Sequence, residues 1–296
     1  MNFIKRFGLI IVLNLLIMTT ISIVLSVFNV RPYLANNGID YSMLMVFCLI
    51  WGFGGAFISL LLSKFIAKKM MGVQIITEAD LRDADGQWLF QTVTRLSQHA
   101  GLAKVPEVGI YQGDEMNAFA TGPSRSNSLV AVSTGLLRKM NRNELEGVLA
   151  HEIAHIANGD MVTMTLVQGV VNAFGMFLAR VVGHLLSTAV DEEKAPMVRM
   201  IATIVLDIFF NILGMFLVSY VSRRREFRAD KGGAAIGGRE KMIMALQRLQ
   251  SEMAPIPAER SPVATMQISN RRGGFLNLLS THPSLEDRIA RLKQFA

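Results

Sequence analysis

Residues 141–160 read NRNELEGVLAHEIAHIANGD, and this stretch decides the fold around it. Asn141 followed by Glu144 three residues later is the pattern of an N-terminal capping box, so a helix is predicted over about residues 142–160. Within it, His151 and His155 lie four positions apart and share one face, one turn apart. Both imidazoles could therefore reach one cation, which makes this helix the candidate carrier of the chemistry.

Glu152 sits beside that face, where its carboxylate could reach a water on the cation rather than the cation itself. H-E-x-x-H on a helix is the arrangement of zinc metallopeptidases, in which zinc lowers the pKa of a water and the glutamate takes its proton. Apolar neighbours on both sides of the motif provide the dry surroundings that such a site needs. The alternative is a pair of solvated surface histidines.

A catalytic zinc site also needs a third protein ligand and one open position. From His155 to Asp191 is 36 residues and from Asp191 to Glu226 is 35, so a helical hairpin with nearly equal arms would return Glu226 to the level of His155. Asp230 follows four residues later on the same helical face and could hydrogen-bond a ligand histidine. The alternative for Glu226 is a surface ion pair with a neighbouring arginine.

Four long apolar stretches are predicted to be transmembrane helices, because each exceeds the length that a helix needs to cross a hydrocarbon core of ~30 Å. They cover residues 7–28, 41–63, 161–187 and 200–222. The last two contain polar residues, and we favour two spans over a helical hairpin buried in protein. Arg180 and Asp207 would lie at similar depth there and form an ion pair; alternatively, Asp207 faces a water-filled cavity.

The basic residues indicate how these spans are oriented. Of the 30 Lys and Arg residues, 26 lie before the first span, between the second and third, or after the fourth, and two lie in the other loops. Basic loops stay in the cytoplasm, so both termini and both large polar segments are predicted to be cytosolic. Most of these residues belong to the polar segments, whereas Lys64, Lys68, Lys69 and Arg223 to Arg225 border the membrane and suit anionic lipid headgroups. The lipid bilayer is therefore a predicted partner, and no nucleic acid is expected. A single cysteine, Cys48, excludes a disulfide framework.

The predicted fold class is α+β: a mostly helical membrane protein with four transmembrane helices and a cytosolic zincin-like domain that contains a small mixed sheet. Its predicted parts are residues 1–63 (two spans), 64–160 (first part of the cytosolic domain), 161–222 (membrane hairpin) and 223–296 (second part). Strands are predicted at 105–112, 117–121 and 128–133, and further helices at 77–101, 239–251 and from Ser284. Residues 253–274 are predicted to be a mobile loop, which we hypothesise covers the cleft.

Four separated motifs together resemble the HtpX-type membrane metallopeptidases, which are gluzincins and more distantly similar to the CaaX prenyl-processing zinc endopeptidases. The motifs are HEIAH (151–155), EFRAD (226–230), NAFATG (117–122) and THPSLEDR (281–288). The resemblance covers essentially the whole chain. It implies one zinc ion per subunit, with His151, His155 and Glu226 as ligands. It also implies Glu152 as general base and Asp230 as a support for a ligand histidine.

The same resemblance points to three further residues. Asn117 would lie on a strand edge that binds the substrate backbone by strand addition. His282 and Arg288 are candidates to steady the oxyanion or the substrate. Each has a plainer alternative: a turn residue for Asn117, a packing residue at a helix start for His282, and an exposed helix residue for Arg288.

The sequence therefore predicts a zinc-dependent endopeptidase in a bacterial cytoplasmic (inner) membrane, with its site on the cytosolic side. Its expected substrates are peptides and membrane proteins cut in cytosolic loops, and the resemblance implies a role in quality control under stress. One alternative is a processing peptidase for a defined substrate, such as a lipidated C-terminus. Another is a non-enzymatic membrane adaptor or transporter with a structural metal.

Overall fold

The computed structural model describes residues 23, 34–35, 38–76, 84–253 and 281–294. These residues belong to two compact units, one from residues 1–70 and 161–218, the other from residues 71–160 and 219–296. Apart from Ile23, the predicted first span lies outside the described residues. The same holds, apart from Met253, for the predicted mobile loop at 253–274, so both remain predictions.

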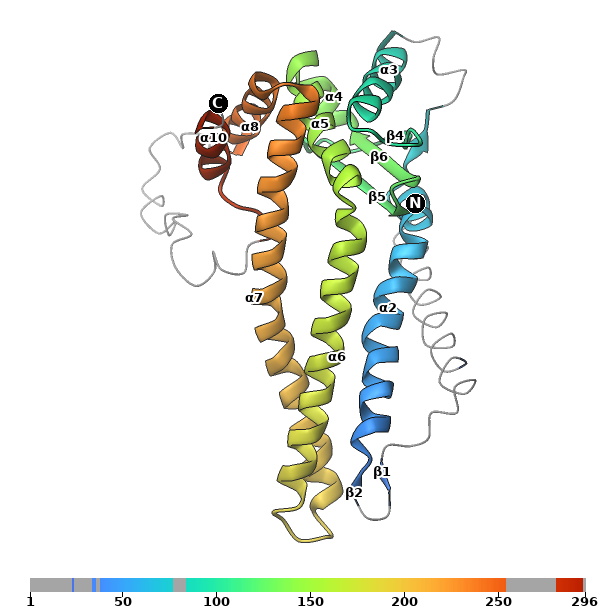
Figure 1. The fold of residues 1–296 in the computed structure, drawn as a ribbon, viewed down its shortest axis with the longest axis vertical. Helices are drawn as coiled ribbons and strands as arrows, with labels where there is room; N and C mark the ends of the chain where they lie inside the picture. Colours follow the sequence, from blue (N-terminus) through green and yellow to red (C-terminus); the bar gives the residue numbers. More distant parts are fainter. Residues whose placement is uncertain (1–22, 24–33, 36–37, 77–83, 254–280, 295–296) are drawn as a thin grey trace, which may run out of the picture. The chain divides into compact units, whose positions relative to one another are not determined.

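The first unit consists mainly of long apolar helices: α2 (Tyr41–Met70), most of α6 (Asp160–Ser187) and the beginning of α7 (Ala195–Gly237). A short antiparallel pair, β1 (Leu34–Ala35) with β2 (Gly38–Ile39), precedes α2 (Figure 1). With 30, 28 and 43 residues, the three helices are long and apolar enough to cross a membrane. Large apolar side chains on α7 are more than half exposed, as expected of a surface that faces lipid: Met200, Ile201, Ile204, Val205 and Ile208.

Close backbone contact and one ion pair join the helices of the first unit. A Cβ on Gly52 of α2 would lie 2.5 Å from the backbone nitrogen of Ala173 on α6, so only glycine permits this approach. Arg180 Nη1 lies 3.6 Å from Asp207 Oδ1. The two residues thus form the ion pair that was expected from their similar predicted depth in the membrane. Pairing reduces the cost of placing each charge among apolar helices.

The second unit contains the predicted small mixed sheet, with strand order β3-β4-β6-β5. β4 (Glu107–Tyr111) runs parallel to β6 (Asn127–Ser133), while β3 (Gln74–Ile75) and β5 (Ala118–Ser124) pair antiparallel with their neighbours. The three predicted strands are thus confirmed within a few residues, and β3 is an additional one. β5 is an edge strand, so its outer backbone groups are not used within this sheet.

The helices of the second unit follow the predicted order, with one addition. In the described part of this unit they are α3 (Ala84–His99), α4 (Thr134–Lys139), α5 (Arg142–Asn158), the end of α7, α8 (Arg239–Met253) and α10 (Leu285–Gln294). α4 was not predicted, because six residues are too few to show helical periodicity. α8 and α10 pack on each other through a core of Met242, Ile243, Leu246, Ile289 and Leu292.

The capping box predicted for α5 is confirmed. Asn141 Oδ1 accepts hydrogen bonds from the backbone N–H groups of Asn143 and Glu144, each at 3.0 Å. Glu144 Oε2 accepts one from the backbone N–H of Asn141 at 2.9 Å. The helix ends at Gly159, whose φ of 70° is the left-handed conformation that glycine adopts at low cost. The capping box thus fixes the start of the helix that carries both histidines, and Gly159 fixes the point at which the chain reverses direction.

Candidate metal centre

Helix α5 brings two imidazoles to one point. The Nε2 atoms of His151 and His155 lie 3.1 Å apart, and the exposed fractions of the two residues are only 8% and 9%. Most of the residues around them on α5 are buried and apolar, including Leu149, Ala150 and Ile153. The two rings therefore meet in a nearly dry environment, as the four-residue spacing and its apolar neighbours predict.

Glu226 reaches the same point from α7, although 71 residues separate it from His155. Its Oε2 lies 3.4 Å from His151 Nε2, its Oε1 lies 3.4 Å from His155 Nε2, and the residue is 1% exposed. Glycines on the same face of α7 allow the approach, since a Cβ on Gly233 would lie 3.1 Å from the His151 backbone nitrogen, and one on Gly237 would lie 2.6 Å from Ala150 Cβ.

The two imidazoles and the carboxylate are spaced to fit a zinc ion. Zinc bonds of about 2.0–2.1 Å in a tetrahedron place neighbouring donor atoms about 3.3 Å apart. Here the two Nε2 atoms lie 3.1 Å apart, and each lies 3.4 Å from a different oxygen of the Glu226 carboxylate, so one ion could contact both rings and the carboxylate with little movement of the side chains. Within the described part of the chain, these residues form the one group of His, Cys, Asp or Glu that could hold a metal.

The outer nitrogen of each ring contacts a buried carboxylate. His151 Nδ1 lies 3.0 Å from Asp230 Oδ1, and His155 Nδ1 lies 2.6 Å from Asp160 Oδ2. A carboxylate at that position fixes the tautomer and the orientation of the ring, so that the other nitrogen can face a metal. Asp230 was anticipated from its spacing to Glu226, but Asp160 was not.

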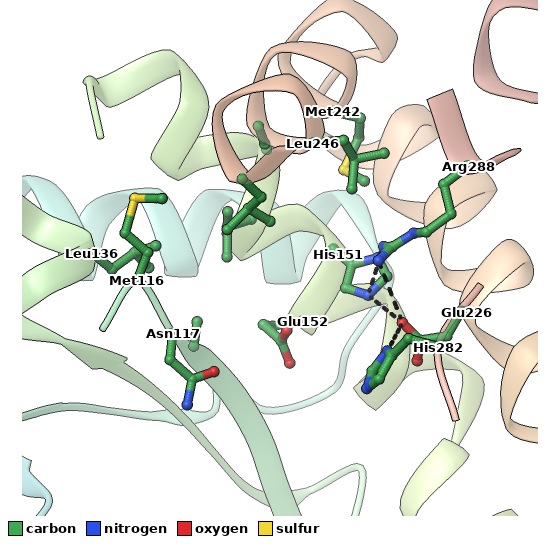
Figure 2. A pocket seen from close by; sticks show the side chains of 15 residues that line it. Met116, Asn117, Leu136, His151, Glu152, Glu226, Met242, Leu246, His282 and Arg288 are labelled. Atoms are coloured by element: carbon green, nitrogen blue, oxygen red, sulfur yellow. Dashed lines mark hydrogen bonds and ion pairs between the residues drawn. The ribbon is translucent and has the colours of Figure 1, made fainter. Parts of the chain in front are cut away.

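The residues that the resemblance added also gather here (Figure 2). His282 Nδ1 lies 3.0 Å from Glu226 Oε2. Arg288 is 7% exposed and donates two hydrogen bonds to Asp230, from Nη2 to Oδ1 at 2.6 Å and from Nε to Oδ2 at 2.8 Å. The alternative of an exposed helix residue is therefore wrong. Asn117, just before β5, lines the same pocket as Glu152.

The charges of the site favour ionised carboxylates and protonated rings in the metal-free protein. Burial raises the pKa of Glu226, but contacts with His151 and His155 outweigh burial and hold this pKa far below its ordinary value. Burial lowers the pKa of His155, but Asp160 and Glu226 raise it overall to about 9. Because imidazole binds a metal only when neutral, a metal ion would displace protons that these carboxylates hold on the rings.

A pocket that is partly open to solvent adjoins the two imidazoles and the Glu226 carboxylate. Figure 2 shows Glu152 within it, between Asn117 and the pair formed by Glu226 and His282. The rest of the lining is largely apolar and comes from α4, α5, α8 and the segment before β5: Met116, Leu136, Val148, Met242, Leu246 and Leu249. A carboxylate near a possible metal and an apolar pocket beside it form an arrangement suited to cutting a polypeptide.

Two polar residues near the site were missed from the sequence. Asp160 follows an Asn-Gly pair and begins α6, so it reads as an ordinary acidic residue at a helix start. Arg228, which contacts Asp160, reads as an ordinary basic residue of a helix. The one available signal was the spacing: Asp160 lies five residues after His155, across a glycine that turns the chain back.

The fold and the site together define a class of protein. A helix with two histidines and a glutamate, a second glutamate brought in by a later helix, and long apolar helices in the same chain are the features of a membrane metallopeptidase. Comparisons with known proteins agree with this class.

The model of peptidase family M48 matches residues 83–296. Protease HtpX homolog of Bacillus licheniformis is 50% identical over 295 residues, which cover 98% of this chain and 99% of the relative. Protease HtpX of Shewanella oneidensis is 49% identical over 297 residues, with the same coverage. The chain belongs to peptidase family M48 and is a zinc metalloprotease of the HtpX type.

A solved structure has a similar fold. The crystal structure of S. mikatae Ste24p matches with a TM-score of 0.63 and 18% sequence identity. The match covers 98% of this chain and 64% of that one, so this chain spans just under two thirds of the length of that structure. At this identity the likeness concerns the fold alone.

Proposed function

We propose that this chain is a membrane-anchored endopeptidase that cuts cytosolic segments of membrane proteins, above all damaged or misfolded ones, in quality control under stress. The observation that carries the proposal is the cluster of two imidazoles and one carboxylate: the Nε2 atoms of His151 and His155 lie 3.1 Å apart, and each lies 3.4 Å from one oxygen of Glu226. Glu152 lines the pocket beside this cluster. We assign His151, His155 and Glu226 as the ligands of one zinc ion per subunit.

The bound zinc ion would supply a Lewis acid that polarises the scissile carbonyl and lowers the pKa of a water. Glu152 is the general base: it takes the proton of the attacking water and passes it to the leaving amine. Asp230 orients His151 through Nδ1, at 3.0 Å. His282, with its side chain 63% exposed, is the more accessible candidate to meet the oxyanion or the substrate.

The substrate backbone would lie along β5. This strand is at an edge of the sheet, and Asn117 immediately precedes it. An extended peptide can pair with the free edge of such a strand, which places its main chain beside Glu152 without requiring a particular sequence. Recognition through backbone groups suits an enzyme that acts on many unrelated, locally unfolded segments.

We further propose a multi-pass topology in a bacterial inner membrane, with four spans and with both termini and the site on the cytosolic side. The predicted parts at 1–63, 64–160, 161–222 and 223–296 belong to this proposal. The distribution of basic residues and the exposed apolar surface of α7 support it. On α7, Glu226 lies four residues after Ser222, the end of the predicted fourth span. A ligand so close to a span end favours substrates cut near the bilayer.

Removal of the metal tests the proposed function directly. We expect the purified full chain, stripped by a chelator, to lose proteolysis of an unfolded membrane protein and to regain it on addition of about one equivalent of zinc. Zinc content by elemental analysis and cleavage by gel and mass spectrometry would be measured on the same samples. Cleavage that persists after verified removal of zinc would contradict the proposal. Cuts in several unrelated membrane proteins would exclude a processing peptidase with one substrate.

The apolar lining of the pocket leads to a prediction about the substrate residue next to the scissile bond. We expect Leu or Met there to be preferred over charged residues. Val148 lies one helical turn before Glu152, so Val148→Phe should narrow the pocket and shift the preference to Ala by about 10-fold or more. The preference would be measured with a library of peptides that differ in the residue next to the scissile bond. Val170→Phe is the control, because Val170 is exposed on α6. An unchanged preference would exclude this pocket as the subsite.

A further inference from the structure

Asp160 contacts charged or metal-facing groups with both of its oxygens. Oδ2 lies 2.6 Å from His155 Nδ1, and Oδ1 accepts a hydrogen bond from Arg228 Nη2. The residue is 1% exposed, although its position at the first residue of α6 would ordinarily leave it in solvent. A carboxylate buried this completely is costly unless each oxygen is paired, and here each one is.

The chain reversal at Gly159 explains how Asp160 reaches back to His155. The Gly159 N–H donates to the carbonyl of Ile156 at 3.0 Å, and its φ of 70° ends α5 and turns the next residue towards the last turn of that helix. Gly159 therefore places a carboxylate beside a histidine only five residues earlier. An acidic residue that acted only on the helix dipole would not need this turn or this burial.

Arg228 comes from α7, two residues after Glu226 and 68 residues after Asp160. Its side chain is 55% exposed, whereas the Asp160 side chain that it contacts is 1% exposed. The guanidinium therefore covers the carboxylate from the solvent side and supplies the opposite charge. Through this contact, the helix that carries Glu226 also holds the group behind His155.

The other histidine has the same three-part arrangement. His151 Nδ1 contacts Asp230, and Asp230 is held by two nitrogens of Arg288. Two rings, each backed by a carboxylate that is itself fixed by an arginine, point their Nε2 atoms at the same place. Since ligand rings must be held in one tautomer and one orientation, this repetition is what a preorganised metal site requires.

We propose that Asp160 is the positioning residue for His155 and that Arg228 keeps the Asp160 carboxylate in place. This inference rests on the proposed function, because His155 must be a zinc ligand for its orientation to matter. With zinc bound, the carboxylate accepts a hydrogen bond from the Nδ1–H of His155, so that the unprotonated Nε2 faces the metal. Neither Asp160 nor Arg228 touches the substrate; both act through the ring.

The test is the zinc affinity of the purified full chain, measured by competition with a chelator. We expect Asp160→Ala to weaken zinc binding by about 10- to 100-fold, the usual range for partners behind a ligand histidine. Asp160→Asn can still accept a hydrogen bond from Nδ1–H and still suits a helix start, so its zinc affinity should lie between that of Asp160→Ala and that of the unsubstituted protein. The visible spectrum of the cobalt-substituted protein should change in Asp160→Ala, because the ligand field depends on the ring orientation.

Arg228 provides an independent arm of the test. Arg228→Met should weaken zinc binding in the same direction but less than Asp160→Ala, and Arg228→Lys, which keeps the positive charge, should restore part of the loss. The matched control is Asp85→Asn. Asp85 also lies in the first turn of a helix and pairs with an arginine, Arg142, at 3.3 Å, but its side chain is 85% exposed. This variant should bind zinc like the natural chain.

The outcomes separate this inference from the proposed function. If His155→Ala loses zinc while Asp160→Ala keeps full affinity and an unchanged cobalt spectrum, Asp160 serves only the start of α6, and the inference is wrong while the metal site stands. If His155→Ala itself keeps full zinc affinity, the metal site is wrong. The melting temperature of each metal-free variant shows whether a loss reflects unfolding. A variant that melts like the natural chain and loses zinc supports positioning.

Discussion

Glutamine in place of Glu152 should reduce kcat for peptide hydrolysis by about 10²- to 10⁴-fold, the usual contribution of a positioned general base. Zinc content should not change, because Glu152 lines the pocket beside His151, His155 and Glu226 and is not one of these three proposed ligands. The amide keeps the shape of the carboxylate but cannot take a proton from water. The loss should therefore fall on kcat rather than on KM.

Cleavage of a fluorogenic peptide and zinc by elemental analysis would be measured on one preparation of the Glu152→Gln protein. Glu240→Gln is the control, because Glu240 is in the first turn of α8 and its side chain is 82% exposed. It should hydrolyse the peptide like the natural chain. A Glu152→Gln protein that holds zinc and keeps its natural turnover would show that another group moves the proton.

Alanine in place of Glu226 should weaken zinc binding by more than about 100-fold. Loss of a residue that only hydrogen-bonds a metal ligand weakens binding by up to about 100-fold, and loss of a ligand itself should cost more. Among the described residues, Glu226 is the only carboxylate that contacts both Nε2 atoms, each at 3.4 Å, so the change leaves two histidines on one helix as the remaining donors. Two imidazoles do not complete the three-ligand set of a catalytic zinc site. Proteolysis should fall with the zinc content.

Glu146→Gln is the matched control for this second prediction. Glu146 is also on the buried side of α5, is 6% exposed, and pairs with Arg95 at 2.8 Å and Lys241 at 2.7 Å. Burial raises the pKa of Glu146, but the two cations outweigh burial and lower it overall, so the control also removes a buried negative charge. It should lower the melting temperature and keep stoichiometric zinc. Stoichiometric, tightly bound zinc in Glu226→Ala with full turnover would end the assignment of Glu226.

Short-range patterns in the sequence were reliable guides to the second unit. The Asn141 and Glu144 pair defined the start of α5 because a capping box is made by residues three apart and needs no partner elsewhere. The spacing of His151 and His155 put both rings on one face for the same reason. Glu226 was reachable only through an added assumption, a hairpin with equal arms, because 71 residues separate it from His155.

Very short helices and strands, and the contacts of side chains that support the metal ligands, could not be predicted from the sequence. β3 has two residues and α4 has six, too few for a periodic pattern to appear. Arg288 could equally be interpreted as an exposed residue, because the local sequence of its helix does not indicate that the guanidinium is buried against Asp230. The first span and the loop at 253–274 lie almost wholly outside the described residues and stay predictions.

By itself, the amino-acid sequence determined the chemistry that this chain can perform, the helix that carries it, and the apolar segments long enough for a bilayer, because each depends on residues close together in the chain. Only the tertiary structure decided that Asp160 lies behind His155 and that His151 is the ring that Asp230 contacts. Asp160 and Asp230 look alike as acidic residues near a motif; the turn at Gly159 brings Asp160 to His155, and the packing of α7 on α5 brings Asp230 to His151. Such contacts depend on where distant backbones meet, which no local pattern encodes.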